Sequence, residues 1–203
     1  MNRRQVVAFV FFAATVLPWP ARGADEAADA FIRRLGTEVI DAARAQPADA
    51  DPGRVIALVD TSIIPNVNFA RMTAAAVGRA WKQATPAQQE RLQDGFKLLL
   101  VRTYAGALTH LKDQAVTVKP LRAAPEEAEV TVKTLVKGGG EPVPIDYRLE
   151  RTTAGWKIID LNVMGVWLVE AYRGQFTAEI NARGIDGLIA ALAERNRVVA
   201  RAN

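Results

Sequence analysis

The clearest hydrophobic pattern in this chain is a pair of alternating segments followed directly by a helical one. Apolar and polar side chains alternate from Val143 to Leu149, and this period of two predicts a strand with one apolar face. Residues 152–155 predict a tight turn, and residues 156–163 a second strand with apolar residues on both faces, as in the middle of a sheet. From Gly165 the apolar spacing becomes three and four, which predicts a helix. We expect this helix to fold back over the hairpin.

The first part of the chain predicts three helices. Apolar residues at helical spacing predict one over residues 24–45. An Asp-Pro pair at residues 51–52 predicts the start of a second helix, which Pro65 ends. Asn68 predicts the cap of a short alanine-rich helix that runs through Ala80.

The strongest local signal is a capping box at the start of a fourth helix. Thr85 can cap, Pro86 stands at the first helical position, and Gln88 completes the box. Apolar side chains spaced three and four apart continue to Leu111. We expect this to be the longest helix and the one that packs on the sheet.

Two further strands precede the hairpin. Val116 and Val118 alternate with polar residues before Pro120, and a longer alternating segment covers residues 128–136. A run of three glycines at residues 138–140 predicts the turn that follows. Together with the hairpin, these segments predict an antiparallel meander of four strands.

The last part of the chain predicts two helices, over residues 165–183 and 186–199, separated by Gly184. The predicted fold class is therefore α+β. Helices come first, a four-stranded antiparallel sheet follows, and the final helices pack on one face of that sheet.

Residues 1–23 predict a signal peptide. The segment begins with two arginines near its start, and its apolar run over residues 6–17 is shorter than the roughly 20 residues that span a bilayer. Ala21 and Gly23 are small residues spaced for signal peptidase, which predicts cleavage before Ala24. An uncleaved membrane anchor and export by the twin-arginine route are the alternatives.

Mass spectrometry of the mature protein is expected to find Ala24, or a residue within a few positions of it, at the N-terminus. Recovery of intact protein that begins at Met1 from the membrane fraction would contradict the prediction.

The remaining residues, 24–203, predict a single domain with a net charge near zero. The whole chain has 26 Lys and Arg against 22 Asp and Glu, and removal of the three arginines in the signal segment leaves a net charge of +1. The basic isoelectric point is therefore poor evidence for nucleic-acid binding, and we expect none. Because the chain has no cysteine, an exported form would depend on its hydrophobic core rather than on disulfides.

Residues that carry catalytic or metal chemistry are sparse. The one histidine, His110, falls near the end of the longest predicted helix, where a surface or capping role is expected. With no cysteine and one histidine, Cys–His sites and His-cluster metal sites are excluded, and we expect no metal or redox cofactor. The three glycines at residues 138–140 do not precede a helix, so they do not predict a phosphate-binding loop.

Two charged groups allow more than one interpretation. Asp146 and Asp160 fall on facing strands, where they could form a carboxylate pair; we favour two exposed carboxylates that pair with Arg148 or Lys157. A second group could form a basic surface for an anionic partner, although a solvated face is the simpler interpretation. Its members are Arg71, Arg79, Lys82 and Arg91.

Large apolar and aromatic side chains are concentrated where the predicted sheet meets the predicted helices. They are Phe96, Tyr104, Tyr147, Trp81, Trp156, Trp167, Tyr172 and Phe176. A packed core and a pocket for an apolar ligand are both built from such residues, so this pattern does not distinguish between them.

A series of short segments resembles the MlaC family, also called toluene-tolerance or ABC-transporter auxiliary proteins. The segments are residues 68–72 (NFARM), Trp81, residues 84–89 (ATPAQQ), Phe96, Leu99, Tyr104, and residues 144–149 (PIDYRL), 155–160 (GWKIID), 165–166 (GV), 172–176 (YRGQF) and 187–189 (GLI). They occur in order and cover residues 31–192, nearly the whole predicted mature chain.

The resemblance implies a non-enzymatic periplasmic carrier that shuttles lipid, chiefly phospholipid, between membranes. Its partners would be an inner-membrane ABC transporter complex and an outer-membrane lipoprotein complex. The fold implied is a sheet with a helical bundle and an apolar pocket between them, with the headgroup near the surface. A related branch, HpnM, is associated with hopanoids, so a polycyclic lipid is the alternative ligand. The family usually has an acidic residue and a serine where this chain has Met164 and Trp167.

We expect the lipid-binding residues to be the inward-facing side chains of this pocket. They are Val130, Val132, Val143, Ile145, Tyr147 and Leu149 on the strands, and Phe96, Leu100, Tyr104, Val169, Tyr172 and Phe176 on the helices. An enzyme on a similar fold and an adaptor protein with a filled core are the rival interpretations.

Overall fold

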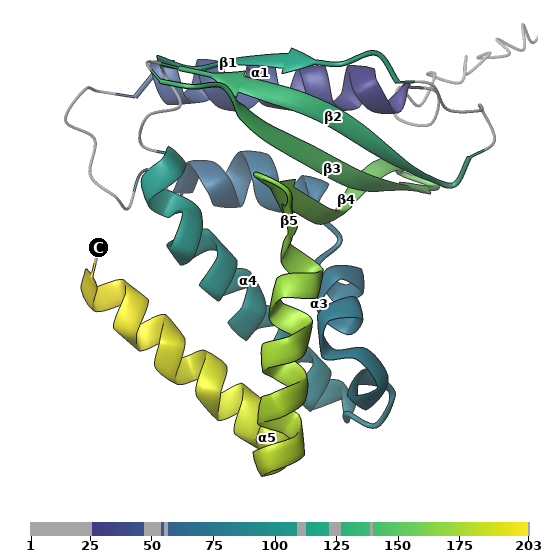
Figure 1. Cartoon of the computed structure of the whole chain (residues 1–203), viewed down its shortest axis with the longest axis vertical. Coiled ribbons are helices and arrows are strands. Elements are labelled where there is room, and N and C mark those ends of the chain that lie inside the picture. The colour runs from purple at the N-terminus through teal and green to yellow at the C-terminus, as the bar shows by residue number, and fades with distance from the viewer. Residues whose placement is uncertain are drawn as a thin grey trace, which may run out of the picture.

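The computed structural model describes residues 26–46, 54, 57–108, 113–121, 127–138 and 140–202. The predicted signal peptide, the Asp-Pro helix start and His110 lie outside these ranges. Figure 1 shows two parts: a curved sheet with α1 (Ala28–Arg44) along it, and a group of helices that extends from the sheet. That group contains α3 (Phe69–Val77), α4 (Pro86–Leu108) and α5 (Leu168–Ala202).

The sheet is an antiparallel meander, as predicted, but it has five strands rather than four. They run in the order β1 (Ala115–Val118), β2 (Glu129–Lys137), β3 (Val143–Thr152), β4 (Gly155–Val163) and β5 (Val166–Trp167). The α+β fold class is confirmed.

The fifth strand replaces the predicted start of the last helix. Met164 and Gly165 form a two-residue loop, and both have positive φ, 53° and 91°, as a tight hairpin loop of this kind requires. Asn162 stabilises the loop, because its Oδ1 accepts a hydrogen bond from the Gly165 N–H at 2.8 Å. The helix therefore begins at Leu168 and not at Gly165.

A β-bulge explains why the second strand of the hairpin has apolar residues on both faces. Arg148 pairs with Asp160, but Leu149 pairs with Ile158, so Ile159 is the extra residue on β4. The bulge shifts the alternation by one residue. Even-numbered positions before Ile159 and odd-numbered positions after it therefore point to the same face of the sheet. Trp156 and Ile158 share that face with Leu161 and Val163.

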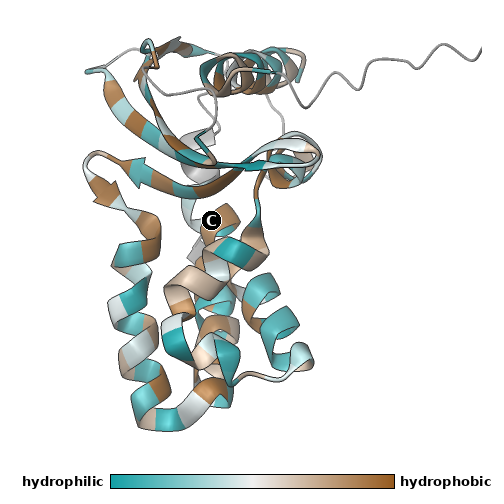
Figure 2. Cartoon of the chain, turned by 90° about the vertical axis from the view of Figure 1, so that its right-hand side faces the viewer, coloured by the Kyte–Doolittle hydropathy of each residue, from teal (hydrophilic) through white to brown (hydrophobic). Residues whose placement is uncertain are grey.

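Helix α1 packs against part of this inner face of the sheet. Its buried stripe includes Phe31, Leu35 and Val39, and it lies in one cluster with Val132 and Leu149. Hydrophobic positions alternate with hydrophilic ones along the strands and around the helices in Figure 2, as this packing requires.

Two of the predicted helix caps lie within the described residues, and both are present. The Asn68 side chain accepts a hydrogen bond from the Arg71 N–H at 3.1 Å. Thr85 and Gln88 form the reciprocal bonds of the capping box, at 3.0 and 3.2 Å. Helix α3 ends earlier than predicted, because Gly78 has a φ of 68° and a 3₁₀ turn, η3 (Gly78–Lys82), follows.

Helices α4 and α5 enclose an aromatic core. The Phe96 ring lies 5.0 Å from that of Tyr172 and 5.2 Å from that of Phe176, both in edge-to-face geometry. Gly184, with φ 71° and ψ −174°, breaks α5 into two arms, which confirms the predicted separation. The second arm approaches α4 closely at Gly95, where an added Cβ would lie 3.2 Å from the Leu192 Cβ.

The alternative of a carboxylate pair does not form. The favoured interpretation is correct that Asp160 pairs with Arg148, at 3.5 Å, but wrong that Asp160 is exposed. Asp146 lies opposite Asn162, whereas Asp160 lies opposite Arg148 and is only 2% exposed. The Asp160 Oδ1 accepts hydrogen bonds from two backbone N–H groups, including that of Val169 in the first turn of α5 at 3.1 Å. Burial raises the pKa of Asp160, while these N–H groups and Arg148 oppose the rise.

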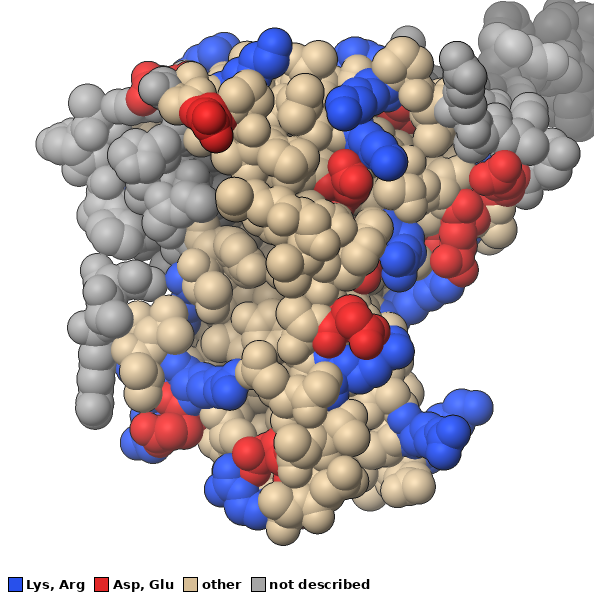
Figure 3. All heavy atoms as spheres, in the orientation of Figure 1, with Lys and Arg blue, Asp and Glu red and all other residues tan. Residues whose placement is uncertain are grey.

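The alternative of a basic surface loses one member, Arg71, to an ion-pair network. Arg71 contacts both Glu129 and Glu150, and the Asn68 Nδ2 donates to Glu150 Oε1 at 2.6 Å, so this group connects α3 to the sheet. On the face shown in Figure 3, charged side chains of both signs are intermixed around an uncharged middle region. This arrangement is typical of a solvated surface.

Candidate functional site

An apolar cavity of about 350 Å³ lies between the inner face of the sheet and the helices. Strands β1 to β4 provide one wall, through Val116, Val136, Val143, Ile145, Tyr147, Ile158, Leu161 and Val163. The segments facing them provide the other, through Ile32, Leu35, Gly36, Val39, Ile40, Val59, Ile63, Ile64, Val67, Phe69, Met72, Leu100, Val101, Tyr104 and Leu168, and Gln114 also lines the space. We call this space the inner cavity.

The inner cavity is suited to an apolar ligand. None of its described lining residues is charged. A cavity lined by aliphatic side chains holds water poorly, so an apolar guest would replace little bound solvent. Each methylene group transferred from water into such a site contributes about 0.8 kcal/mol.

Tyr147 is a polar residue in this otherwise apolar wall, and burial moves its pKa further from neutral pH. Burial raises the pKa of Tyr147 to about 12, although a hydrogen bond with Thr134 acts in the opposite direction. The Thr134 hydroxyl is itself held in place, because it donates to the Ile145 carbonyl at 2.7 Å. Tyr147 therefore presents no charge to a ligand at neutral pH.

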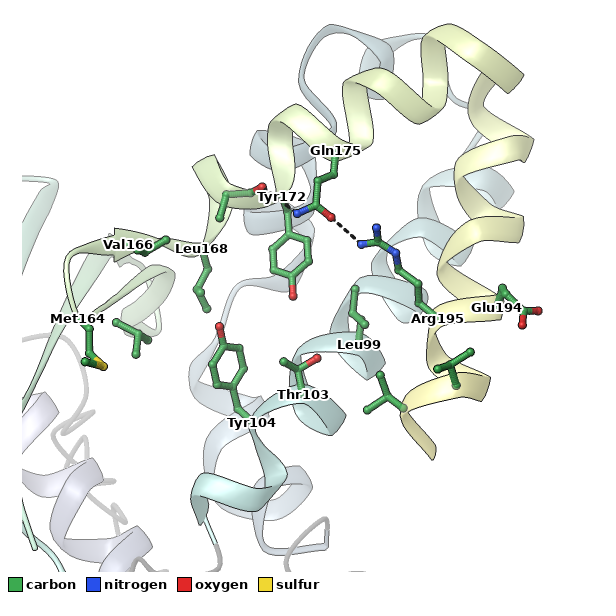
Figure 4. Close-up of a pocket in the computed structure, with 14 residues that line it drawn as sticks. Leu99, Thr103, Tyr104, Met164, Val166, Leu168, Tyr172, Gln175, Glu194 and Arg195 are labelled. Carbon is green, nitrogen blue, oxygen red and sulfur yellow. Dashed lines mark hydrogen bonds between the residues drawn. The ribbon is translucent and has the colours of Figure 1, made fainter. Parts of the chain in front are cut away.

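A second, more open cavity of about 740 Å³ adjoins the first. We call it the outer cavity; it lies between the β4–β5 loop, α4 and the two arms of α5 (Figure 4). It is lined by Leu99, Thr103, Tyr104, Val163, Met164, Val166, Leu168, Ala171, Tyr172, Gln175, Glu194, Arg195, Val198 and Val199. Tyr104, Val163 and Leu168 line both cavities and therefore form the boundary between them.

Two tyrosines lie at or next to this boundary: Tyr104 lines both cavities, and Tyr172 lines the outer one. Figure 4 shows the hydroxyl groups of Tyr104 on α4 and Tyr172 on α5 pointing toward the same space. Burial raises the pKa of Tyr104, and the neighbouring Tyr172 adds to the rise. The boundary thus carries neutral hydroxyl groups in a mainly apolar surrounding.

The structure divides the twelve predicted lipid-binding residues into two groups. Those that line a cavity are Leu100, Tyr104, Val143, Ile145 and Tyr147 in the inner cavity, with Tyr104 and Tyr172 in the outer one. The others are buried in the packed cores: Phe96, Val169 and Phe176 among the helices, and Val130, Val132 and Leu149 between the sheet and α1. We expect this second group to support the walls.

Sequence reasoning placed no part of the pocket on α1, although this helix provides a large part of the inner wall. The sequence does carry a signal, because the apolar residues at helical spacing in 24–45 include Leu35 and Val39, which line the cavity. What the pattern could not show was that one helix face both packs against strands and borders a cavity. Gly36 on the same face fits closely against Val116, with an added Cβ at 3.5 Å from its side chain.

The two residues that depart from the usual family pattern have different surroundings. Met164 lines the outer cavity and is 70% exposed. Trp167 lies beneath the Arg148 guanidinium, whose central carbon is 4.3 Å from the ring centroid.

Within the described ranges, no group of three or more His, Cys, Asp and Glu residues is placed to hold a metal ion. The same part of the chain contains no helix with the length and hydrophobicity needed to cross a bilayer. Within these residues, the site is therefore an apolar cavity whose described lining carries no charge. Such a site defines a class of binding proteins for hydrophobic ligands.

The chain belongs to the MlaC family, because the MlaC protein family matches residues 33–194. The family resemblance found in the sequence is confirmed. The HpnM branch stays a prediction.

Individual relatives agree with this membership. Toluene tolerance protein ttg2D of Pseudomonas putida is 30% identical over 105 residues, which are 52% of this chain and 49% of that protein. The match therefore spans about half the length of ttg2D. The intermembrane phospholipid transport system binding protein MlaC of Haemophilus influenzae is 23% identical over 143 residues, 68% of this chain and 67% of its own.

A solved structure agrees with the fold. The phospholipid-binding protein from Ralstonia solanacearum, determined in complex with a phospholipid, superposes with a TM-score of 0.83 at 43% sequence identity. The similarity covers 86% of this chain and 99% of that one.

Proposed function

We propose that this protein is a periplasmic carrier that binds a phospholipid, with acyl chains in the inner cavity, and moves it between membranes. The observation that supports this most directly is the apolar cavity between sheet and helices, whose described lining carries no charge. The phospholipid bound to the Ralstonia solanacearum protein supports the same ligand class.

The proposed partners are an inner-membrane ABC transporter complex and an outer-membrane lipoprotein complex. A carrier needs such partners for energetic reasons. Burial of several hundred Å² of acyl-chain surface would stabilise the complex by on the order of 10 kcal/mol at about 25 cal/mol per Å². Spontaneous release would then be slow, so a partner must open the cavity or compete for the lipid. We propose no enzymatic activity.

Lipid analysis of the purified protein tests this function. The full chain is expressed in a Gram-negative host, purified from the periplasm without detergent, extracted with organic solvent and examined by mass spectrometry. We expect about one phospholipid per protein. A stoichiometric hopanoid would instead support the HpnM-like alternative, and no stoichiometric lipid would support an adaptor with a filled core.

A further inference from the structure

The inner cavity is small for the proposed ligand. Drug-sized ligands occupy pockets of roughly 300–1,000 Å³, and the inner cavity, at about 350 Å³, is near the lower end of that range. A two-chain phospholipid is larger than a drug-sized molecule. Part of the lipid must therefore lie elsewhere unless the walls move apart. The outer cavity, at about 740 Å³, adjoins the inner cavity at Tyr104, Val163 and Leu168, so it is the space available for the rest of the lipid.

The two charged residues in the described lining of the outer cavity differ in whether they form an ion pair. They are Glu194 and Arg195. Glu194 is ion-paired with Arg197. Within the described ranges, Arg195 has no carboxylate at ion-pair distance. Glu179 is near enough for Arg195 to help lower its pKa, but Glu179 is paired with Arg183. The cavity thus offers one positive charge that no carboxylate neutralises by direct contact.

The Arg195 guanidinium is held toward the cavity by a neutral partner. Its Nη1 donates to the Gln175 Oε1 at 2.7 Å, across the gap between the two arms of α5 (Figure 4). A guanidinium has five N–H donors, so this bond leaves several available to an anion. Arginine also matches the geometry of phosphate oxygens, because two of its N–H groups can bind in parallel.

Hydroxyl groups lie between Arg195 and the inner cavity. Thr103, Tyr104 and Tyr172 line the outer cavity, and Tyr104 also lines the inner one. The described lining of the inner cavity is uncharged and mainly aliphatic, and hydroxyl groups lie at and next to the boundary. The outer cavity adds the Arg195 cation to a lining that is otherwise mainly apolar. A phospholipid has the same order of acyl chains, ester and glycerol oxygens, and phosphate.

We infer that the outer cavity holds the phosphate headgroup on Arg195, with the acyl chains passing Tyr104 into the inner cavity. This inference rests on the proposed function and adds the orientation of the lipid and a residue that recognises its anionic group. It predicts that the protein distinguishes a phospholipid from a neutral lipid with identical chains.

The test compares two lipids in one incubation. Delipidated full-length mature protein is mixed with vesicles that contain phosphatidylglycerol and diacylglycerol with the same acyl chains, and the bound lipid is extracted and quantified. Arg195→Gln is expected to lower the ratio of bound phosphatidylglycerol to diacylglycerol by about tenfold or more, the factor for one hydrogen bond to a charged group. Arg195→Lys is expected to retain part of the preference, because it keeps the charge but not the paired donors.

Arg91→Gln is the matched control. Arg91 is an exposed cation on α4 that lines neither cavity, and its substitution makes the same change in net charge. It should leave the ratio unchanged.

Three results would overturn the inference, and they differ from a failure of the proposed function. An unchanged ratio in Arg195→Gln would place the headgroup elsewhere, and an equal loss of both lipids would make Arg195 a structural residue. Loss of the wild-type preference in millimolar inorganic phosphate, with total bound lipid unchanged, would indicate a site for free anions. If the wild-type protein bound neither lipid, the carrier function itself would be refuted along with this inference.

Discussion

Val143→Trp is expected to remove most of the bound lipid, at least tenfold, while changing the free energy of unfolding of the lipid-free protein by less than about 1 kcal/mol. Val143 lines the inner cavity at the start of β3, so an indole ring there would occupy space that we assign to an acyl chain. The added ring fills a void instead of displacing packed atoms, and for this reason little strain is expected. Extracted lipid per protein and urea unfolding of the delipidated protein are the two measurements.

Val132→Trp is the matched control on the neighbouring strand. Val132 is fully buried between the sheet and α1 and borders neither cavity. Overpacking of a filled core by even a few methylene groups costs about 1–3 kcal/mol, and an indole ring should cost more than that. We therefore expect Val132→Trp to fold poorly or not at all. If Val143→Trp kept its lipid, or were as unstable as Val132→Trp, the inner cavity would not be the acyl-chain site.

Phe96→Ala is expected to destabilise the lipid-free protein by about 3–5 kcal/mol, which is a large part of the stability of a typical domain. Phe96 is 0% exposed, and its ring makes edge-to-face contacts with Tyr172 and Phe176. Removal of the ring leaves a cavity where α4 meets α5, and the two helices can close it only in part. Urea unfolding monitored by circular dichroism measures the loss.

A control variant and the amount of bound lipid distinguish whether Phe96 supports the cavity wall or contacts the ligand. Leu98→Ala, two positions along the same helix at a residue that is 37% exposed, should cost less than about 1 kcal/mol. Phe96→Ala, prepared at low temperature, should still bind lipid at the wild-type ratio, because Phe96 supports the wall without lining it. Lost lipid with nearly unchanged stability would instead make Phe96 a ligand-contacting residue, as the sequence interpretation proposed.

Local features of the chain were predictable because few distant residues affect them. The capping box at Thr85 and Gln88, the Asn68 cap and the helix break at Gly184 each depend on residues a few positions apart. The alternation along β2 and β3 likewise predicted the face of each strand that the structure buries. The family could also be recognised, because its segments lie in order along the chain.

Features that depend on strand pairing were not predictable. The bulge at Ile159 reverses the alternation of β4, and only the register against β3 reveals it. Asp160 resembled an exposed strand carboxylate, yet it is buried where β4 meets the start of α5. Its environment comes from a helix that the sequence predicted, with its start at Gly165 instead of Leu168, but could not orient.

The sequence by itself determined the α+β class, most helix and strand positions, and an apolar stripe on each element. Only the tertiary structure decided which apolar residues border empty space and which fill the cores, because a methyl group follows the same pattern in both places. Val132 and Val143 are both apolar positions of alternating strands, yet one is buried in the packed core and the other lines the inner cavity. The difference arises because α1 packs directly on the sheet at Val132, whereas a cavity separates sheet and helices at Val143, and this depends on the packing of all the elements together.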